Sequence, residues 1–404
     1  MSKSSTTLSN TPVLGADWFD PLEDALRGGI RSYVQELVEL EVTAALGRVR
    51  YGRQSQARGY RNGCRRRTLI GTCGRIEVDI PRARIVAVNG TTREFRSAVV
   101  PRYRRLTERA LALIAGAYLS GTNTRRVRRA LGALFGGSVG KDTVSRAWHK
   151  VSADFAVWNA RDLSQENIVR VILDGTVVKV RLDRQATTMS LLVAMGVRAD
   201  GQKVVLAIRG LGGESEAAWR ALLEDLVARK MATPSLLIID GGKGLEAALA
   251  ALWPTVPVQR CTVHKHLNLL AHAPKKLHDE ISADYNTMIY AASASGVRDE
   301  RKKFLRKWKL RCRAVADSLE EAGERLFTFL RFPEAQWRSI RTTNAIERLH
   351  EEFKRRIKTQ CVLPCTETAA MLFWALLASG QITLRKIDGW QSLATEPSVL
   401  DLAA

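Results

Sequence analysis

Cysteine is scarce in this chain, which has six among its 404 residues. Domains that depend on disulfides are short and rich in cysteine. Six thiols in a chain of this length therefore form no disulfide framework, and we expect them to be reduced. Cys361 and Cys365 have the spacing C-x3-C, but no second pair stands where it would complete a zinc site. The six cysteines are Cys64, Cys73, Cys261, Cys312, Cys361 and Cys365.

Long apolar runs are also missing. The longest, from Ala369 to Ala378, is about half of the ~18 residues that indicate a transmembrane helix. The first ten residues, MSKSSTTLSN, lack the apolar stretch of a secretory leader. We therefore expect a cytoplasmic protein without a membrane partner.

Acidic residues are few, because 41 Asp and Glu face 63 Lys and Arg, a net charge of +22. The excess is local: residues 48–150 hold 24 basic and 5 acidic side chains, a net +19, whereas residues 151–260 hold 13 and 12. A strongly basic region favours an anionic polymer, and nucleic acid is the first partner to expect. We expect residues 151–260, in which basic and acidic side chains nearly balance, to have a role other than simply binding phosphates.

The sequence pattern divides the chain into five segments. Residues 1–16 are polar, and we expect them to be disordered. We interpret residues 17–150 as a mainly helical N-terminal DNA-binding region. It has an amphipathic helix at 18–46, an Arg- and Gly-rich basic loop at 47–74 and a small β unit at 75–85. The other segments are 151–261, 262–340 and 341–404.

Residues 106–148 have the pattern of three short helices, with Thr107 as an N-cap and Gly121 as a stop. Short helices joined by small turns resemble a helix-turn-helix, in which an Arg-bearing helix enters the major groove. The alternative is an arginine-rich face that is merely solvated. The arginines that we expect to contact DNA here are Arg125, Arg126, Arg128 and Arg129.

Residues 151–261 predict the order β-β-β-α-β-α-β of a ribonuclease-H-like α/β domain with a mixed five-stranded sheet. Three β-branched runs separated by turn residues predict an antiparallel meander. The wholly apolar SLLIID at 235–240 predicts a strand buried on both faces. Residues 262–340 have only helical periodicity and are too long for a loop, so we expect an all-helical insertion. Residues 341–404 then supply the C-terminal helices of the core and a tail.

Asp240 ends the apolar strand, at the carboxyl edge of the sheet where α/β folds gather ligands. It could equally be the N-cap of the next helix. Asp174 lies inside the first strand, where propensity disfavours aspartate and burial of a lone carboxylate is costly. In a ribonuclease-H-like order the first and fourth strands are neighbours, so Asp174 and Asp240 should lie side by side and need a divalent ion between them.

Glu347, in the amphipathic segment RTTNAIERLHEEFKRRIK, is the candidate third ligand. The alternative is a capping box, because Asn344 stands three residues before it. Two Asp and one Glu suit a pair of Mg2+ ions about 4 Å apart acting on a phosphodiester. In CTVHKH, the residues Cys261, His264 and His266 could bind zinc, but packing is the more common role for such residues. DGGKGL lacks the spacing of a Walker loop.

These residues together resemble the Mutator-type transposases of bacterial insertion sequences, which carry an Asp-Asp-Glu ribonuclease-H-like nuclease. The resemblance covers about residues 30 to 385. It is carried by RGYRNGCRRRTLIGTCGRIEVDIPRAR, ILDGT, IIDGGKGL, the C-x2-H of CTVHKH and RTTNAIERLHEEFKRRIK. It implies that Asp174, Asp240 and Glu347 are the catalytic metal ligands. It also implies that Cys261 and His264 form a structural motif and that the basic N-terminal region binds terminal inverted repeats.

The expected protein is therefore a nucleoid-associated DNA transposase that uses two Mg2+ or Mn2+ ions to cut and join DNA strands. Its partners would be the element ends, the target DNA and a second copy of itself, in a homodimer or higher oligomer. The rivals are a ribonuclease-H-like nuclease or resolvase without strand transfer, and a non-catalytic DNA-binding regulator. Outside the four arginines above, the expected DNA contacts are Arg61, Arg65, Arg66, Arg67, Lys354, Arg355 and Lys358.

Overall fold

The computed structural model describes residues 21–52, 58–87, 90–102, 105–119, 131, 141–182, 185–358, 362–363 and 365–394. They form two compact units, a first unit that ends at Lys150 and a second unit that begins at Val151. Helix α4 (Lys141–Asn159) spans the boundary. Arg125, Arg126, Arg128 and Arg129, with most of the predicted helix-turn-helix, lie outside the described residues. No helix in the described ranges combines the length and apolarity needed to cross a bilayer.

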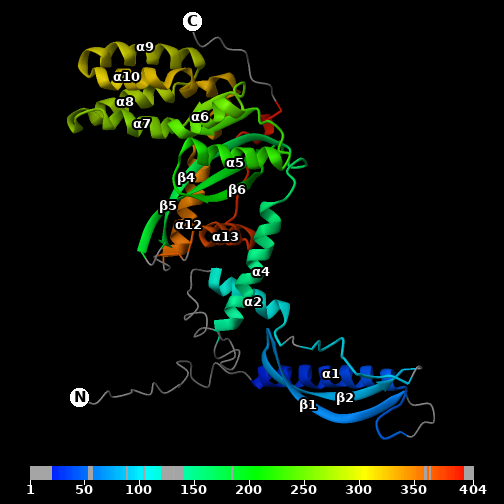
Figure 1. Ribbon diagram of the computed structural model, residues 1–404. Helices are drawn as coiled ribbons and strands as arrows, with labels where there is room; N and C mark the ends of the chain where they lie inside the picture. The colour runs from blue at the N-terminus through cyan, green and yellow to red at the C-terminus, as the bar shows by residue number, and fades with distance from the viewer. Residues whose placement is uncertain are drawn as a thin grey trace, which may run out of the picture. The chain divides into compact units, whose positions relative to one another are not determined.

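The first unit pairs a long helix with a three-stranded antiparallel sheet (Figure 1). Helix α1 (Pro21–Leu46) begins with proline at a position where the missing amide hydrogen costs nothing. Its Val42 and Leu46 pack against Ala83 of the sheet. The strands are β1 (Gly59–Gly71), β2 (Gly74–Val86) and β3 (Thr92–Glu94).

The predicted basic loop at 47–74 is wrong from Gly59 to Gly71, because these residues form strand β1. Arg65, Arg66 and Arg67 pair with Ile80, Asp79 and Val78 of β2. Glycine and asparagine disfavour strands, but the backbone hydrogen bonds offered by β2 outweigh that local preference. A register shift between Arg61 and Cys64 contains Gly63, whose φ of 75° favours glycine.

A small core joins β1 to the helices that follow. It consists of Ile70, Ala110, Ile114 and Ala147, from β1, α2 (Glu108–Leu119) and the start of α4. The predicted N-cap at Thr107 is confirmed, since its Oγ1 accepts a hydrogen bond from the amide of Ala110 at 3.2 Å.

The second unit is built on a five-stranded mixed sheet with the order β6-β5-β4-β7-β8. Strands β4 (Ile168–Leu182), β5 (Gln185–Arg198) and β6 (Lys203–Leu211) form the predicted antiparallel meander. Strands β7 (Leu236–Ile239) and β8 (Val258–Arg260) continue it in parallel from β4. The predicted β-β-β-α-β-α-β succession is therefore confirmed.

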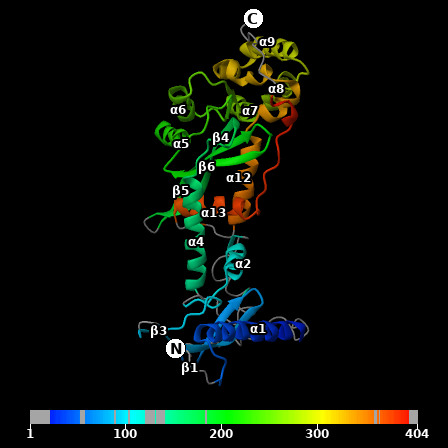
Figure 2. The ribbon, with the colours of Figure 1, turned by 90° about the vertical axis from the view of Figure 1, so that its right-hand side faces the viewer.

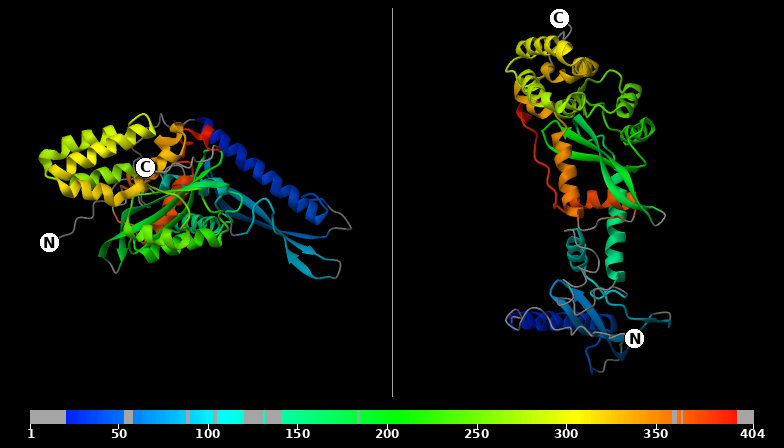
Figure 3. Two further views of the ribbon diagram at one scale, coloured as in Figure 1. Left: turned by 90° about the horizontal axis from the view of Figure 1, so that it is seen from above. Right: turned by 90° about the vertical axis from the view of Figure 1, so that its left-hand side faces the viewer.

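Helices cover both faces of this sheet (Figures 2 and 3). Helices α5 (Glu216–Ala228) and α6 (Lys243–Leu252) share a hydrophobic core with alternate residues of the central strands, such as Val171, Leu173 and Ile239. Helices α12 (Asn344–Ile357) and α13 (Thr366–Ala378) contact β4 from the other side (Figure 3). The side-chain alternation of a strand thus decides which helices each residue meets.

Residues 262–340 are helical, as predicted. The helices are α7 (Thr262–Ala271), α8 (His278–Ile289), α9 (Ala294–Arg311), α10 (Arg313–Ala322) and α11 (Glu334–Ile340). Short 3-10 turns lie at Lys275–Leu277, Gly323–Leu326 and Thr328–Arg331. Helices α7 to α10 stack beside one another (Figure 1). These helices lie between β8 and α12 in the sequence, but in the folded unit α12 packs against β4.

Candidate active site

Two aspartates stand at adjacent strands of the sheet, Asp174 within β4 and Asp240 directly after β7. Strands β4 and β7 run parallel, with Leu173 beside Ile239. Asp174 and Asp240 follow at the next position, on strands that are about 4.8 Å apart in a sheet. Since Leu173 faces α5 and α6, alternation turns Asp174 toward the opposite face, on which α12 lies. The predicted neighbourhood of the first and fourth strands is confirmed.

Asp174 is buried, with 8% of its surface exposed. Its Oδ2 lies 3.2 Å from Nδ1 of His350, a buried residue of α12. The His350 ring packs edge-on against Phe373 of α13, which fixes its plane. Within the described residues Nε2 of His350 has no hydrogen-bond partner. The imidazole therefore orients one carboxylate oxygen of Asp174.

Asp240 is not the N-cap of the helix that follows it. Helix α6 begins at Lys243 with Gly242 as its N-cap and without a side-chain cap. The Oδ1 of Asp240 instead accepts a hydrogen bond from the amide of Gly242 at 3.0 Å. The intervening Gly241 has a φ of 96°, and a β carbon there would come within 2.6 Å of the Arg260 guanidinium. The turn holds the Asp240 carboxylate just past the strand end.

Glu347 is one turn before His350 on α12, the helix that contacts β4. The capping-box alternative fails because the helix begins one residue earlier than it requires. Thr343 is the N-cap, which makes Glu347 the fourth helical residue instead of the third. The Thr343 hydroxyl donates a hydrogen bond to Oε1 of Glu347 at 2.5 Å. The helix therefore presents this carboxylate beside the sheet.

The C-x2-H pair lies next to Glu347. Nδ1 of His264 is 3.6 Å from Oε1 of Glu347, and the Thr343 amide donates to Sγ of Cys261 at 3.4 Å. Burial alone would raise the pKa of the Cys261 thiol, but hydrogen bonds with His264 and Thr343 bring it below its ordinary value. The contact with Cys261 raises the pKa of His264 to about 9, with further support from Glu347 and Asp174.

Glu214 is a fourth carboxylate that the sequence did not single out. It precedes the N-cap Ser215 of α5. Its side chain lies against Gly175, where an added β carbon would be 2.2 Å from Oε1 of Glu214. Burial raises the pKa of Glu214, and the nearby Asp240 and Asp174 raise it further. The position after Asp174 is thus glycine because a carboxylate fills the space of a side chain.

The first-unit arginines that the sequence predicted to contact DNA differ from one another in their surroundings. Arg61 is bound to α1 through Glu39 and Thr43, at 2.8 and 3.1 Å. Arg66 pairs with Asp79, and Arg67 donates to the carbonyls of Val100 and Pro101. A pocket of about 670 Å³ collects basic residues that the sequence pattern did not group. Its lining residues are Arg65, Arg66, Arg67, Thr68, Arg102, Arg105 and Arg146.

On α12, Lys354, Arg355 and Lys358 follow Glu347 by two to three turns. Arg355 is exposed and pairs with Glu352 at 2.8 Å, an interaction that solvent screens. Lys354 and Lys358 are also exposed. The C-terminal end of α12 therefore presents a basic surface on the same helix that carries Glu347 in its first turn.

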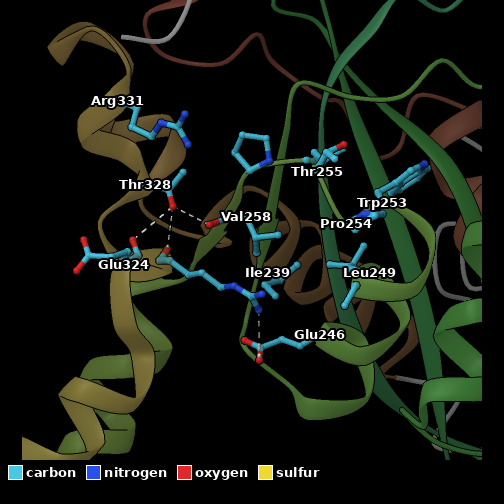
Figure 4. A pocket seen from close by; sticks show the side chains of 14 residues that line it. Ile239, Glu246, Leu249, Trp253, Pro254, Thr255, Val258, Glu324, Thr328 and Arg331 are labelled. Carbon is cyan, nitrogen blue, oxygen red and sulfur yellow. Dashed lines mark hydrogen bonds and ion pairs between the residues drawn. The ribbon is translucent and has the colours of Figure 1, made fainter. Parts of the chain in front are cut away.

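Another pocket, of about 430 Å³, is separate from the three carboxylates. It lies between α6, β8 and the segment before α11, and Glu246, Thr328 and Arg331 are among the residues that line it (Figure 4). Thr328 closes one wall by donating a hydrogen bond to the carbonyl of Val258. Asp174, Asp240 and Glu347 do not line this pocket, and we assign it no part in the chemistry.

Comparison with known proteins identifies close relatives over most of the chain. The profile described as "Transposase, Mutator family" matches residues 3–383. The transposase for insertion sequence element ISRM5 of Rhizobium meliloti (strain 1021) is 30% identical over 353 residues, which cover 87% of each chain. The transposase for element IS406 of Burkholderia multivorans is 30% identical over 374 residues, 91% of this chain and 94% of that protein.

Among solved structures, the magnesium complex of the HTLV-2 integrase catalytic core domain, in its trimeric form, matches 45% of this chain and 97% of that chain. Its sequence identity is 14% and its TM-score is 0.17.

Proposed function

The chain belongs to the Mutator family of transposases, and on this premise we propose that Asp174, Asp240 and Glu347 are its catalytic carboxylates. The reaction would cut DNA at the ends of an insertion sequence and join the freed end to a target. The observation that carries the proposal is the parallel register of β4 and β7, which pairs Leu173 with Ile239, the residues directly before Asp174 and Asp240.

The donor set suits a hard divalent cation. Carboxylate oxygens are the ligands that Mg2+ prefers, and Mn2+ accepts the same ligands. Asp174 is buried beside a second carboxylate, and two such groups repel each other unless a cation lies between them. When bound, a pair of these ions would polarise the scissile phosphate and lower the pKa of the attacking oxygen. The residues that would hold them are Asp174, Asp240 and Glu347.

Each carboxylate has a separate support in the fold. Asp174 is anchored within a central strand and oriented by His350, and Asp240 is held by the turn at Gly242. Glu347 is on a helix that also carries basic residues, so DNA phosphates could lie along α12 beside the carboxylates. We propose that water attacks first and releases a 3′ hydroxyl. That hydroxyl then attacks a second phosphodiester without a covalent protein intermediate.

We assign DNA-end binding to the first unit, within the region 17–150. Its arginine-lined pocket offers several guanidinium groups to phosphate oxygens, which arginine binds in a bidentate way. Recognition of two terminal repeats at once would require at least a homodimer. Residues 262–340 would form an insertion between β8 and α12.

The test uses the purified full-length protein and a labelled DNA fragment that carries one element end. We expect Asp174→Ala, Asp240→Ala and Glu347→Ala each to abolish strand cleavage in Mg2+ while leaving binding of the fragment within a few-fold. Glu351→Ala, an exposed residue one turn beyond Glu347, is the control and should keep its activity. Full cleavage by any of the three variants would refute the assignment.

The same assay separates the rivals. A nuclease or resolvase would cut branched or hybrid DNA but give no joined product with a target fragment. A non-catalytic regulator would bind DNA alike with and without Mg2+, and the three substitutions would change nothing.

A further inference from the structure

Three residues of different chemistry converge on one point beside the carboxylates. Cys261 is the N-cap of α7 and His264 lies in its first turn, while Glu347 comes from the first turn of α12. One ligand atom from each, Sγ, a ring nitrogen and a carboxylate oxygen, lies within 4.8 Å of the other two. In the described ranges this is the only triple of His, Cys, Asp or Glu with such spacing.

The donors select a class of metal. A thiolate, an imidazole and a carboxylate suit a borderline-soft ion such as Zn2+, whereas Mg2+ prefers oxygen alone. In a tetrahedral zinc site the bond lengths place neighbouring ligand atoms about 3.3 to 3.8 Å apart. The 3.6 Å between Nδ1 of His264 and Oε1 of Glu347 fits that range.

Thr343 supports two of the three ligands. It is fully buried, its amide donates to Sγ of Cys261, and its hydroxyl donates to Glu347. Hydrogen bonds of this kind orient the ligands of metal sites. The side chains of His264 and Glu347 are 37% and 32% exposed, so an ion can reach them from solvent.

The two proposed metal sites compete for Glu347. Oxygens of Asp174, Asp240 and Glu347 do not all lie within 4.8 Å of one another, whereas Glu347 meets that limit with Cys261 and His264. Its Oε1 faces His264 and Thr343. An ion bound there would hold the carboxylate on the side of the thiol.

We propose that Cys261, His264 and Glu347 bind one ion of the Zn2+ class, and that this ion inhibits the enzyme by withholding Glu347 from the two aspartates. The inhibition rests on the proposed function, but the binding does not. Neither oxidation nor transfer of any group is involved, since the ion only exchanges water for three protein ligands. The Cys261 thiol and the His264 imidazolium, whose pKa is raised to about 9, release their protons to solvent.

Binding is tested with Co2+, which replaces Zn2+ and gives a thiolate-to-metal absorption band. The full-length protein should show the band at one equivalent, and added Zn2+ should remove it. Cys261→Ser and His264→Ala should weaken binding by about tenfold or more. Cys312→Ser, a half-buried thiol outside the cluster, should not. Because Cys261 is buried, circular dichroism is used to check that Cys261→Ser still folds. If it does not, the result for His264→Ala decides, since His264 is more exposed. The absence of a band, or a band that survives both substitutions, would overturn the site.

Inhibition is tested by cleavage of an element end in excess Mg2+ with increasing Zn2+. For each protein the rate is divided by its own rate without Zn2+. For the parent protein this ratio should fall at a Zn2+ concentration about tenfold lower than for His264→Ala. Equal sensitivity would overturn the inhibitory role. A protein that binds Co2+ through Cys261 but never cleaves DNA would refute the proposed function and leave the metal site standing.

Discussion

At the scale of single residues, Asp174 occupies a strand position that ordinarily excludes aspartate. The free-energy cost of burying its carboxylate is offset locally by His350. Nδ1 of His350 lies 3.2 Å from Oδ2 of Asp174, and the His350 ring packs against Phe373. A ligand carboxylate that is oriented by a second residue binds its metal with less loss of side-chain entropy. His350 is therefore a positioning residue for the proposed metal site.

Replacement of His350 tests this role. His350→Leu removes the donor and should lower Mn2+ affinity and cleavage by about 10- to 100-fold. His350→Asn places an amide nitrogen near the position of Nδ1 and should restore most of both. Calorimetric titration with Mn2+ and the cleavage rate are the measurements, and His272→Leu, an exposed histidine of the same unit, is the control. If Asn proves as damaging as Leu, His350 serves packing alone.

The sequence predicted the frame of the candidate site. The adjacency of β4 and β7 followed from the strand order, because register fixes which residues of adjacent strands align. His350 and Glu214 could not be found in that way. Their roles depend on where α12 and the loop before α5 lie against the sheet, and one chain offers no local signal of such contacts. The N-cap alternatives for Asp240 and Glu347 differ from the structure by two residues and one residue, because α6 is capped at Gly242 and α12 at Thr343.

At the scale of elements, the strand β8 is joined to the helical segment that follows it by a buried glutamine. Gln259 is fully buried and uses both ends of its amide. Its Nε2 donates to the carbonyls of Arg260 and Leu326, and its Oε1 accepts from the amide of Phe329. Removal of one partner from such a network leaves the others unsatisfied.

We expect Gln259→Met, which keeps the volume, to destabilise the second unit by about 1 to 3 kcal/mol, because the Phe329 amide loses its acceptor. The midpoint of thermal unfolding should fall by several degrees. Gln381→Met, at an exposed position, should leave it unchanged. An unaltered midpoint for Gln259→Met would show that the network does not stabilise this junction.

The elements were predictable where hydrophobic periodicity was strong. The meander, the buried strand β7 and the helices of 262–340 followed from it. Strand β1 did not, because its arginines and glycines have the composition of a loop. Pairing with the alternating residues of β2 makes it a strand, a tertiary effect that no local pattern contains.

At the scale of the whole molecule, charge is divided between the two units. The net +19 of residues 48–150 includes the arginines that line the pocket of the first unit. Phosphate contacts of this type release counterions from DNA, and each makes binding more sensitive to salt. Residues 151–260 of the second unit, with 13 basic and 12 acidic side chains, include Asp174 and Asp240, to which we assign the chemistry in our proposal.

Salt dependence checks this division. Arg65→Gln and Arg105→Gln should each weaken binding of any DNA fragment and reduce the slope of log affinity against log salt by about 0.9 per lost phosphate contact. Arg313→Gln, an exposed residue of the second unit, should leave the slope unchanged. Slopes that do not differ between the first-unit variants and the control would place the DNA contacts elsewhere.

The central claim is that three distant carboxylates meet around divalent ions at a DNA phosphate. The most direct measurement is a crystal structure of the protein with an element end and Mn2+, in which anomalous scattering locates the ions. The account predicts anomalous peaks within bonding distance of Asp174, Asp240 and Glu347, next to the scissile phosphate. Peaks bound elsewhere, or a complex in which these carboxylates stay apart with DNA and Mn2+ present, would contradict it.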